Sequence, residues 1–195
     1  MQHIVEFIIE LDKLKSIMRK NKPVGQSRNE NSAEHSWQIA MLAIAAESYA
    51  ATPVHIDRVV KMLLVHDIGE IDTGDTIVYA NIDWESEKQK ELVAVERIFG
   101  LLRNEALEQQ LLTLWQEFEA GETDDAVFAH ALDRGMPPLL NLHSNGQSWV
   151  ENGITYDAVV NRIRAPIMKG CPKLWEFIEK QLNEQRDKGW FGMNS

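Results

Sequence analysis

Residues 57–75 read DRVVKMLLVHDIGEIDTGD, an apolar stretch that runs directly into a histidine and a group of carboxylates. In its first part, apolar residues recur three and four positions apart, which is the spacing of an amphipathic α-helix. We expect this helix to take Thr52-Pro53 as its cap and first turn and to end at Gly69, because proline suits the first helical turn and glycine the position after the last. The polar residues 70–83 that follow are expected in a loop outside the core.

The same helical period continues along the rest of the chain, and alternating strand patterns are hard to find. A first helix is expected from Ile4 to Met18, and a second over 32–50 begins at a capping box formed by Asn31 and Glu34. Further helices are expected at about 84–102, 104–120, 124–143 with a disruption near Pro137-Pro138, 155–168 and 172–188. The sequence therefore predicts an all-α fold.

Length and charge limit the classes of function. The 195 residues are enough for one domain, 1–195, with a sizeable core. A net charge of −10 disfavours extended nucleic acid and anionic membranes as partners, although a small anionic substrate held through a metal remains compatible with it. The single cysteine, Cys171, cannot form an internal disulfide, and residues 1–15 read as neither a signal peptide nor a membrane span. We expect a cytoplasmic protein.

The histidine and carboxylates of the opening stretch could share one ion. On a helix, His66 and Glu70 are four residues apart and lie on one face, whereas the adjacent Asp67 points about 100° away. His66 and Asp67 reach the same ion only if it lies between them near the helix end. Taken alone, the pair has a plainer interpretation, in which Asp67 and Glu70 are solvated charges at the end of a helix.

Two further segments favour a metal site. AEHSWQIAMLA places His35 in the first turn of an apolar helix, and AHALDRGMPPLL places Asp133 in a late apolar helix. Each side chain needs a polar partner if it is buried. Facing helices in a bundle commonly assemble metal sites. Two imidazole nitrogens and two carboxylate oxygens suit a divalent ion such as Mn, Fe, Co, Ni or Zn.

The order of a histidine, a His-Asp pair and a distant aspartate resembles the HD-domain metal-dependent phosphohydrolase superfamily. RNENSAEHSWQIAM (28–41), LLVHDIGEIDTGD (63–75) and the aspartate of HALDRGMP look like segments of its bacterial 5′-deoxynucleotidase and HD-domain-containing protein 2 group. LDKLKSIMR (11–19) is similar to the family's leading helix, so the likeness covers about 11–140. The resemblance implies an HD-domain helical bundle, usually a homodimer, that releases phosphate from a nucleoside 5′-monophosphate. Helices over about 155–188 would pack on that core.

Carried over residue by residue, the family pattern implies four ligands of one divalent cation (Mn, Co, Ni, Fe, Zn or Mg), namely His35, His66, Asp67 and Asp133. It also implies that Glu70 and Asp75 are catalytic groups beside the metal. Arg19 matches the arginine that contacts the substrate phosphate, and its planar fork suits phosphate oxygens. Which of Glu70 and Asp75 handles the water and which the leaving oxygen stays open.

One departure from the family affects the substrate. The bacterial deoxynucleotidases follow the arginine with a tryptophan associated with excluding the ribose 2′-hydroxyl, whereas this chain has Lys20. The resemblance therefore implies a (deoxy)nucleoside 5′-monophosphate without deciding the sugar. Two alternatives stay open: an HD-type hydrolase of a nucleotide diphosphate or phosphodiester, and a nucleotide-binding regulatory module without turnover. Glu70 and Asp75 favour an enzyme, since a purely structural cation does not require them.

The remaining candidate residues have simpler interpretations. His130 lies three residues before Asp133 and is a candidate for a second metal, but no further matching histidines accompany it. Arg28 and Glu34 are expected to form a salt bridge or a cap, with support of the first histidine ligand as the alternative. Asp72 is expected in solvent, and Cys171 is expected to be structural rather than a nucleophile.

Overall fold

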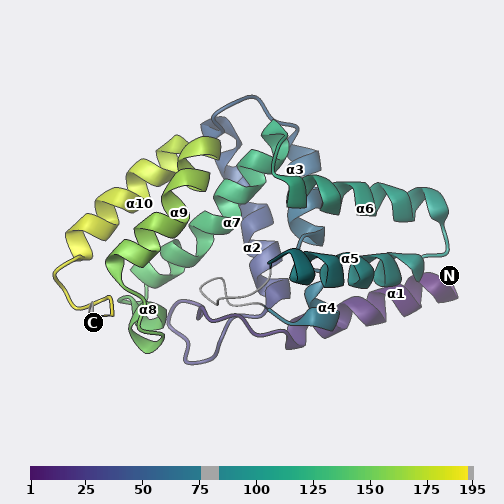
Figure 1. Ribbon diagram of the computed structural model, residues 1–195, viewed down its shortest axis with the longest axis horizontal. Coiled ribbons are helices and arrows are strands. Elements are labelled where there is room, and N and C mark those ends of the chain that lie inside the picture. The colour runs from purple at the N-terminus through teal and green to yellow at the C-terminus, as the bar shows by residue number, and fades with distance from the viewer. Residues whose placement is uncertain (76–83, 193–195) are drawn as a thin grey trace.

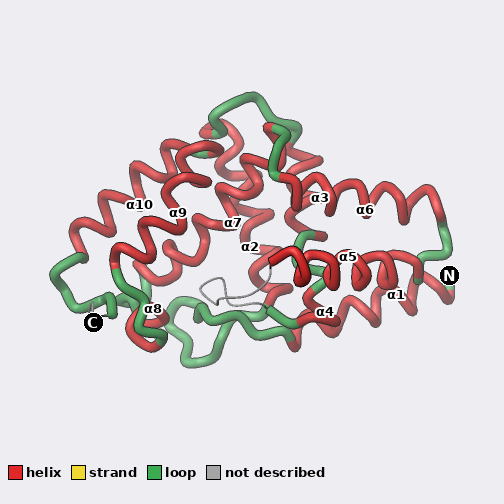
Figure 2. Tube along the Cα trace, viewed as in Figure 1, coloured by secondary structure: helices red, strands yellow, loops and turns green. Residues whose placement is uncertain are grey.

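The computed structural model of the protein describes residues 1–75 and 84–192. Within these ranges the regular structure is helical, and the one β-type feature is an isolated bridge between Met18 and Asn31 (Figures 1 and 2). The α-helices are α1 (Gln2–Asp12), α2 (Ser32–Ala46), α3 (Ile56–Val65), α4 (Glu70–Thr73), α5 (Trp84–Gly100), α6 (Glu105–Ala120), α7 (Asp124–Leu142), α8 (Gln147–Glu151), α9 (Tyr156–Gly170) and α10 (Pro172–Gln185). Two short 3-10 helices, η1 (Lys13–Ser16) and η2 (Glu47–Tyr49), follow α1 and α2. The predicted all-α class is confirmed.

The expected bounds of the third helix are wrong at both ends. α3 begins at Ile56 because the backbone N–H of His55 donates to Asp125 Oδ1 at 2.7 Å, so contact with α7 sets its start. At the other end, Gly69 has a helical φ of −59° and precedes α4 instead of ending α3. Its small size suits the close approach of α5, because a Cβ would come within 3.2 Å of the Glu91 carbonyl oxygen.

Two other expected elements differ from the structure. The first helix ends at Asp12 and passes into η1, while Met18 lies in the isolated bridge and is 51% exposed. α7 continues through Pro137 and Pro138, so the expected disruption of this helix is wrong. Residues 70–73 form α4 within the expected loop, and residues 76–83 of that loop lie outside the described ranges.

The core consists of two apolar clusters that share α7. The larger cluster is built mainly by α2, α3, α5, α6 and α7, and the smaller one by the C-terminal part of α7 with α8, α9 and α10. Figure 1 shows α7 in the middle of the molecule, and it packs against α9 and α10 as well as α2 and α3. This arrangement brings the first turn of α2, the end of α3 and the middle of α7 together. A single domain over the whole chain stays a prediction.

The contact between α9 and α7 requires a glycine at position 170. A Cβ on Gly170 would lie 2.3 Å from the carbonyl oxygen of Val127 and 2.8 Å from the Cβ of Ala131. We therefore expect Gly170→Ala to lower the free energy of unfolding by about 1–3 kcal/mol, as overpacking does elsewhere. Chemical denaturation measures this change. Gly100→Ala is the matched control, since a Cβ at that position would meet no described atom of another element within 4 Å; an equal loss there would contradict the packing explanation.

Candidate active site

Three helices bring the predicted histidines and the distant aspartate to one buried point. His35 lies in the first turn of α2, which begins at the predicted capping box between Asn31 and Glu34. His66 directly follows α3, and Asp133 lies in the middle of α7. One ligand atom from each of His35, His66 and Asp133 lies within 4.8 Å of the others. His35 Nε2 is 3.0 Å from Asp133 Oδ1, although the two residues are 98 positions apart.

The ring of His66 has a defined orientation. Its Nδ1 lies 2.9 Å from the carbonyl oxygen of Leu63, and because a carbonyl only accepts, this nitrogen carries the proton. α6 holds the same turn, since Trp115 Nε1 donates to the His66 carbonyl at 3.1 Å and Phe118 packs edge-on against the imidazole. Nε2 of His66 therefore faces the point shared with Asp133, where its lone pair would be available to a cation that replaces a proton.

The group fits a divalent cation. His66 Nε2 is buried without a hydrogen-bond partner among the described residues, and it lies 2.9 Å from Asp67 Oδ1 and 3.9 Å from Asp133 Oδ1. Two imidazole nitrogens and one carboxylate oxygen, from His35, His66 and Asp133, thus converge, and Asp67 adds a second carboxylate next to His66. Nitrogen and carboxylate oxygen donors of this kind suit a Zn-, Mn- or Fe-type site. The assignment of all four residues as ligands stays a prediction.

The protonation states suit metal binding. Burial lowers the pKa of His35 to about 4, and the Arg19 charge acts in the same direction, so this imidazole is neutral near pH 7. Burial opposes ionisation of Asp67, but His66 and Arg19 outweigh it and lower the pKa of Asp67 to about 2. Burial likewise opposes protonation of His66, yet Asp67 and Asp133 outweigh it and raise the pKa of His66. Asp67 and Asp133 therefore favour a positive charge at His66, which a divalent cation could supply in place of the His66 proton.

Glu70 is buried, although the sequence placed it in a polar loop. It opens α4, is only 8% exposed, and its Oε2 accepts a 2.6 Å hydrogen bond from the Ser32 hydroxyl at the start of α2. Burial and the Asp67 charge raise the pKa of Glu70 to about 9. Sequence reasoning missed Ser32, whose position three residues before His35 was the available signal.

Asp75 follows Gly74, whose φ of +79° turns the chain at the end of α4. Its Oδ1 lies 4.0 Å from Arg19 Nη1, and burial raises the pKa of Asp75 against the opposing effect of Arg19. Asp67 raises the pKa of both predicted catalytic carboxylates, so both lie within its electrostatic reach. They come from one short segment but have different anchors, a hydroxyl for Glu70 and a guanidinium for Asp75.

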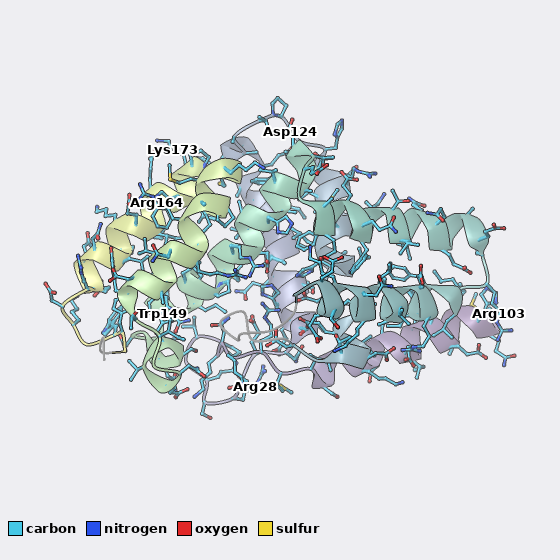
Figure 3. The ribbon with its side chains drawn as sticks, viewed as in Figure 1. Arg28, Arg103, Asp124, Trp149, Arg164 and Lys173 are labelled. Carbon is cyan, nitrogen blue, oxygen red and sulfur yellow. The ribbon has the colours of Figure 1, made fainter. Side chains whose placement is uncertain are left out.

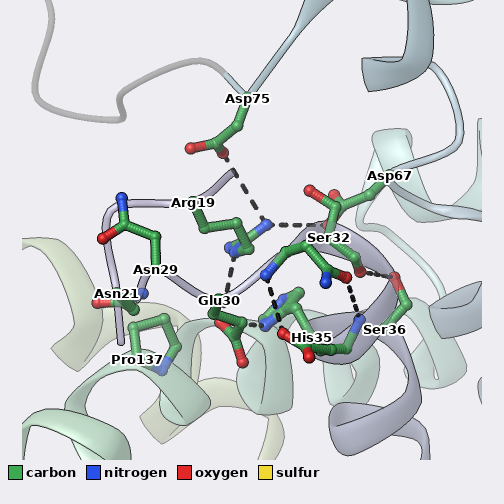
Figure 4. A network of polar contacts seen from close by, with 12 residues as sticks. Arg19, Asn21, Asn29, Glu30, Ser32, His35, Ser36, Asp67, Asp75 and Pro137 are labelled. Carbon is green, nitrogen blue, oxygen red and sulfur yellow. Dashed lines mark hydrogen bonds and ion pairs between the residues drawn. The ribbon is translucent and has the colours of Figure 1, made fainter. Parts of the chain in front are cut away.

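Arg19 reaches the site from the segment that joins η1 to α2. Its backbone N–H donates to the carbonyl of Glu30 at 2.9 Å, and the N–H of Glu30 donates to Asn21 at 2.8 Å, so two short extended segments pair like a ribbon. Figure 4 shows the Arg19 side chain lying between Asp67, Asp75 and Glu30. Its Nη1 donates to Asp67 Oδ2 at 2.9 Å. The predicted phosphate-contacting residue is therefore beside a predicted ligand.

His130 and Asp72 have structural partners that bear on their expected roles. Nε2 of His130 lies 2.7 Å from the Phe118 carbonyl and its ring stacks on Phe118, which disfavours a second metal there. Asp72 is exposed, as expected, and it also has an ion-pair partner. Arg97 donates to both of its carboxylate oxygens at 2.7 Å and also reaches Glu10, thereby tying α4 to α5 and α1.

Other minor expectations hold. Arg28 lies at the surface (Figure 3) and its guanidinium grips Glu34 with contacts of 2.8 and 2.6 Å, while Glu34 completes the capping box. The salt bridge and the cap therefore account for both side chains. Buried Cys171 donates to the Tyr49 carbonyl and has a raised pKa because of burial, as expected of a structural thiol.

Comparisons with known proteins agree with this geometry. The HD domain family model matches residues 11–175. The crystal structure of a predicted metal-dependent phosphohydrolase from Magnetospirillum magnetotacticum is 39% identical, with a TM-score of 0.90, over 98% of this chain and 95% of that chain. A crystal structure of a Pyrococcus horikoshii protein, 18% identical with a TM-score of 0.62, covers 93% of this chain and 98% of that one and shares the fold.

Curated relatives include the 5′-deoxynucleotidase HDDC2 of Xenopus laevis, 29% identical over 67% of this chain, and that of Homo sapiens, 32% identical over 55% of it. The chain spans 64% and 50% of the length of these two relatives, respectively. The predicted helical-bundle class and family are confirmed together. The family model matches from the end of α1 to α10, and a solved relative is similar along nearly the whole chain. This chain therefore belongs to the HD domain family.

Proposed function

We propose that this protein is a divalent-metal-dependent phosphohydrolase that releases phosphate from a small phosphomonoester, a (deoxy)nucleoside 5′-monophosphate. One observation carries the proposal: the unpartnered Nε2 of His66 faces Asp67 and Asp133 at a buried point that Arg19 borders. The names of the relatives, 5′-deoxynucleotidase and metal-dependent phosphohydrolase, support the same reaction class.

His35, His66, Asp67 and Asp133 would hold one divalent cation. Such a cation lowers the pKa of water and neutralises a phosphate oxygen. The protein supplies a neutral His35, ionised carboxylates and a His66 ring fixed by Leu63, so the donors need little rearrangement to bind it.

The other groups act on the substrate and on protons. Arg19 presents a planar guanidinium beside Asp67, where it can grip phosphate oxygens in a fixed orientation. Glu70 and Asp75 would exchange protons with the attacking water and the leaving 5′ oxygen. Ser32 fixes Glu70, and Arg19 lies near Asp75, so each carboxylate has a group that positions it.

The sugar preference depends on Lys20. This residue is exposed, and its charge lowers the pKa of Asp75 against the raising effect of burial, so its ammonium lies near the site. A flexible ammonium cannot close off a ribose 2′-hydroxyl as an indole does. We therefore propose that ribo- and deoxyribonucleotides are both accepted, and that Lys20→Trp increases the preference for deoxyribose. If the preference between deoxyribo- and ribonucleotides is unchanged in this variant, Lys20 does not determine the sugar preference.

A phosphate-release screen tests the proposed reaction. Purified protein is supplied in turn with Mn, Co, Ni and Mg and offered ribo- and deoxyribonucleoside 5′-monophosphates, sugar phosphates, nucleoside diphosphates and phosphodiesters. We expect release from the nucleoside monophosphates. Cleavage of a diphosphate or diester without any monophosphate turnover would instead support the second hydrolase class, and nucleotide binding without any turnover would support a regulatory module.

We also propose a homodimer. α1 buries Phe7 but exposes the aliphatic side chains of Ile4, Val5, Ile8 and Ile9 by 36–64%, an apolar surface of the kind that association covers. Sedimentation at micromolar concentration tests this, and a monomer would contradict it. The single cysteine supports the proposed cytoplasmic location.

The charge of −10 supports a small anionic partner over extended nucleic acid. No helix in the described part of the chain is long and apolar enough to cross a bilayer.

A further inference from the structure

Glu30 is a buried carboxylate with no assigned role. It lies just before α2, is 2% exposed, and its Oε2 has no hydrogen-bond partner among the described residues. Its backbone is held on both sides, since its carbonyl accepts from the Arg19 N–H and its own N–H donates to Asn21. The pairing of these segments places the side chain of Glu30 between Arg19 and α2.

Two other unpartnered buried atoms face this carboxylate. Nε of Arg19 and Nδ1 of His35 each lie 3.8 Å from Glu30 Oε2, and both lack a hydrogen-bond partner among the described residues (Figure 4). A distance of 3.8 Å exceeds a hydrogen bond, yet it is close enough for strong attraction in a buried setting. Because unpaired buried polar groups are costly, the coincidence of three at one place points to a common purpose.

The two nitrogens of His35 face different carboxylates. Nε2 faces Asp133, on the side of the metal cluster, and Nδ1 faces Glu30 on the opposite side. A neutral imidazole carries one N–H, so a proton on Nδ1 leaves a lone pair on Nε2 for a metal. A cation on Nε2 would leave the proton on Nδ1, where the Glu30 carboxyl group could accept it, as carboxylates do behind metal-binding histidines in general.

We propose that Glu30 is a positioning residue for both the metal-binding part and the phosphate-binding part of the site. It stabilises the Nδ1–H tautomer of the predicted ligand His35, and it fixes the orientation of the predicted phosphate-contacting residue Arg19. The inference rests on the proposed function for the roles of those two residues. Glu30 is not itself one of the predicted metal ligands or substrate contacts. It acts through His35 and Arg19. The paired segments that bury Glu30 place its one carboxylate next to both side chains.

Two binding measurements that need no turnover test the proposal. The affinity for Co²⁺ alone is measured by calorimetry, and the affinity of the Co²⁺-loaded protein for inorganic phosphate is measured next. Glu30→Ala should weaken Co²⁺ binding by about 10–100-fold, the usual loss when a carboxylate behind a metal-binding histidine is removed. Phosphate binding should weaken as well, because Arg19 loses its second carboxylate.

Glu30→Gln separates the two effects and guards against misfolding. Its amide oxygen can still accept the Nδ1–H of His35, so Co²⁺ binding should fall less than in Glu30→Ala. Because the amide is neutral, it should not hold Arg19 as the carboxylate does, and phosphate binding should stay weakened. Glu34→Gln is the matched control: the same change is made one residue before His35, at an exposed carboxylate that pairs with Arg28. This control should bind Co²⁺ and phosphate like the natural protein.

The outcomes are distinguishable. If Glu30→Gln and folded Glu30→Ala both bind Co²⁺ and phosphate as the natural protein does, the proposed role of Glu30 is wrong. A lower melting temperature with unchanged affinities would reduce Glu30 to a structural residue and also overturn the proposal. If Co²⁺ affinity falls as expected while no nucleoside monophosphate is hydrolysed, the role of Glu30 stands and the proposed reaction fails.

Discussion

Asp67→Ala is expected to release the metal and to lower phosphate release by more than about 100-fold, the upper range for losing even an outer partner of a metal site. Asp67 has two functions in the geometry. Its Oδ1 lies 2.9 Å from Nε2 of His66, and its Oδ2 accepts a hydrogen bond from Arg19. The substitution therefore removes a predicted ligand and frees the arginine in the same step.

Metal analysis of protein purified without a histidine tag, alongside the phosphate-release assay, measures both losses. Asp57→Ala provides a matched control, because Asp57 is an exposed aspartate in the first turn of α3, the helix that Asp67 follows. We expect it to keep the metal content and activity of the natural protein. If Asp67→Ala retains its full metal content, the assignment of Asp67 as a metal ligand is wrong.

The second large effect is expected for Glu70→Gln, which should keep its metal yet lose about 10²–10⁴-fold in kcat, the usual contribution of a positioned acid or base. Glutamine preserves the shape of the side chain and can still accept from the Ser32 hydroxyl, which lies 2.6 Å from Glu70 Oε2. It cannot exchange a proton as a carboxyl group does. The loss should therefore appear in turnover and not in metal content.

Two companion variants make this test more specific. Ser32→Ala leaves the carboxyl group in place but frees it to move, so we expect a smaller loss of kcat than in Glu70→Gln. Asp75→Asn is expected to lower kcat while keeping the metal. If Glu70→Gln and Asp75→Asn both bind metal normally and hydrolyse the substrate at the natural rate, the proposed proton chemistry is wrong.

Local sequence patterns predicted much of the fold because they act over a few residues. The capping box of Asn31 and Glu34 lies where the sequence placed it, and its effect is confined to the first turn of α2. The bounds of α3 were wrong because contacts from elsewhere determine them. Asp125 on α7 accepts from the backbone N–H just before α3, and Glu91 on α5 approaches Gly69 closely. No local signal contains either contact.

The sequence by itself determined that the chain is helical and which donors it carries, because helical periodicity and residue type are local properties. Only the tertiary structure decided what those donors face. Trp115 and Phe118 of α6 hold the carbonyl and the ring of His66. Arg97, 25 residues away, pairs with Asp72. Pairing of the segment before α2 buries Glu30 behind His35. Burial and orientation depend on partners distant along the chain, and so they follow from packing and not from the order of residues.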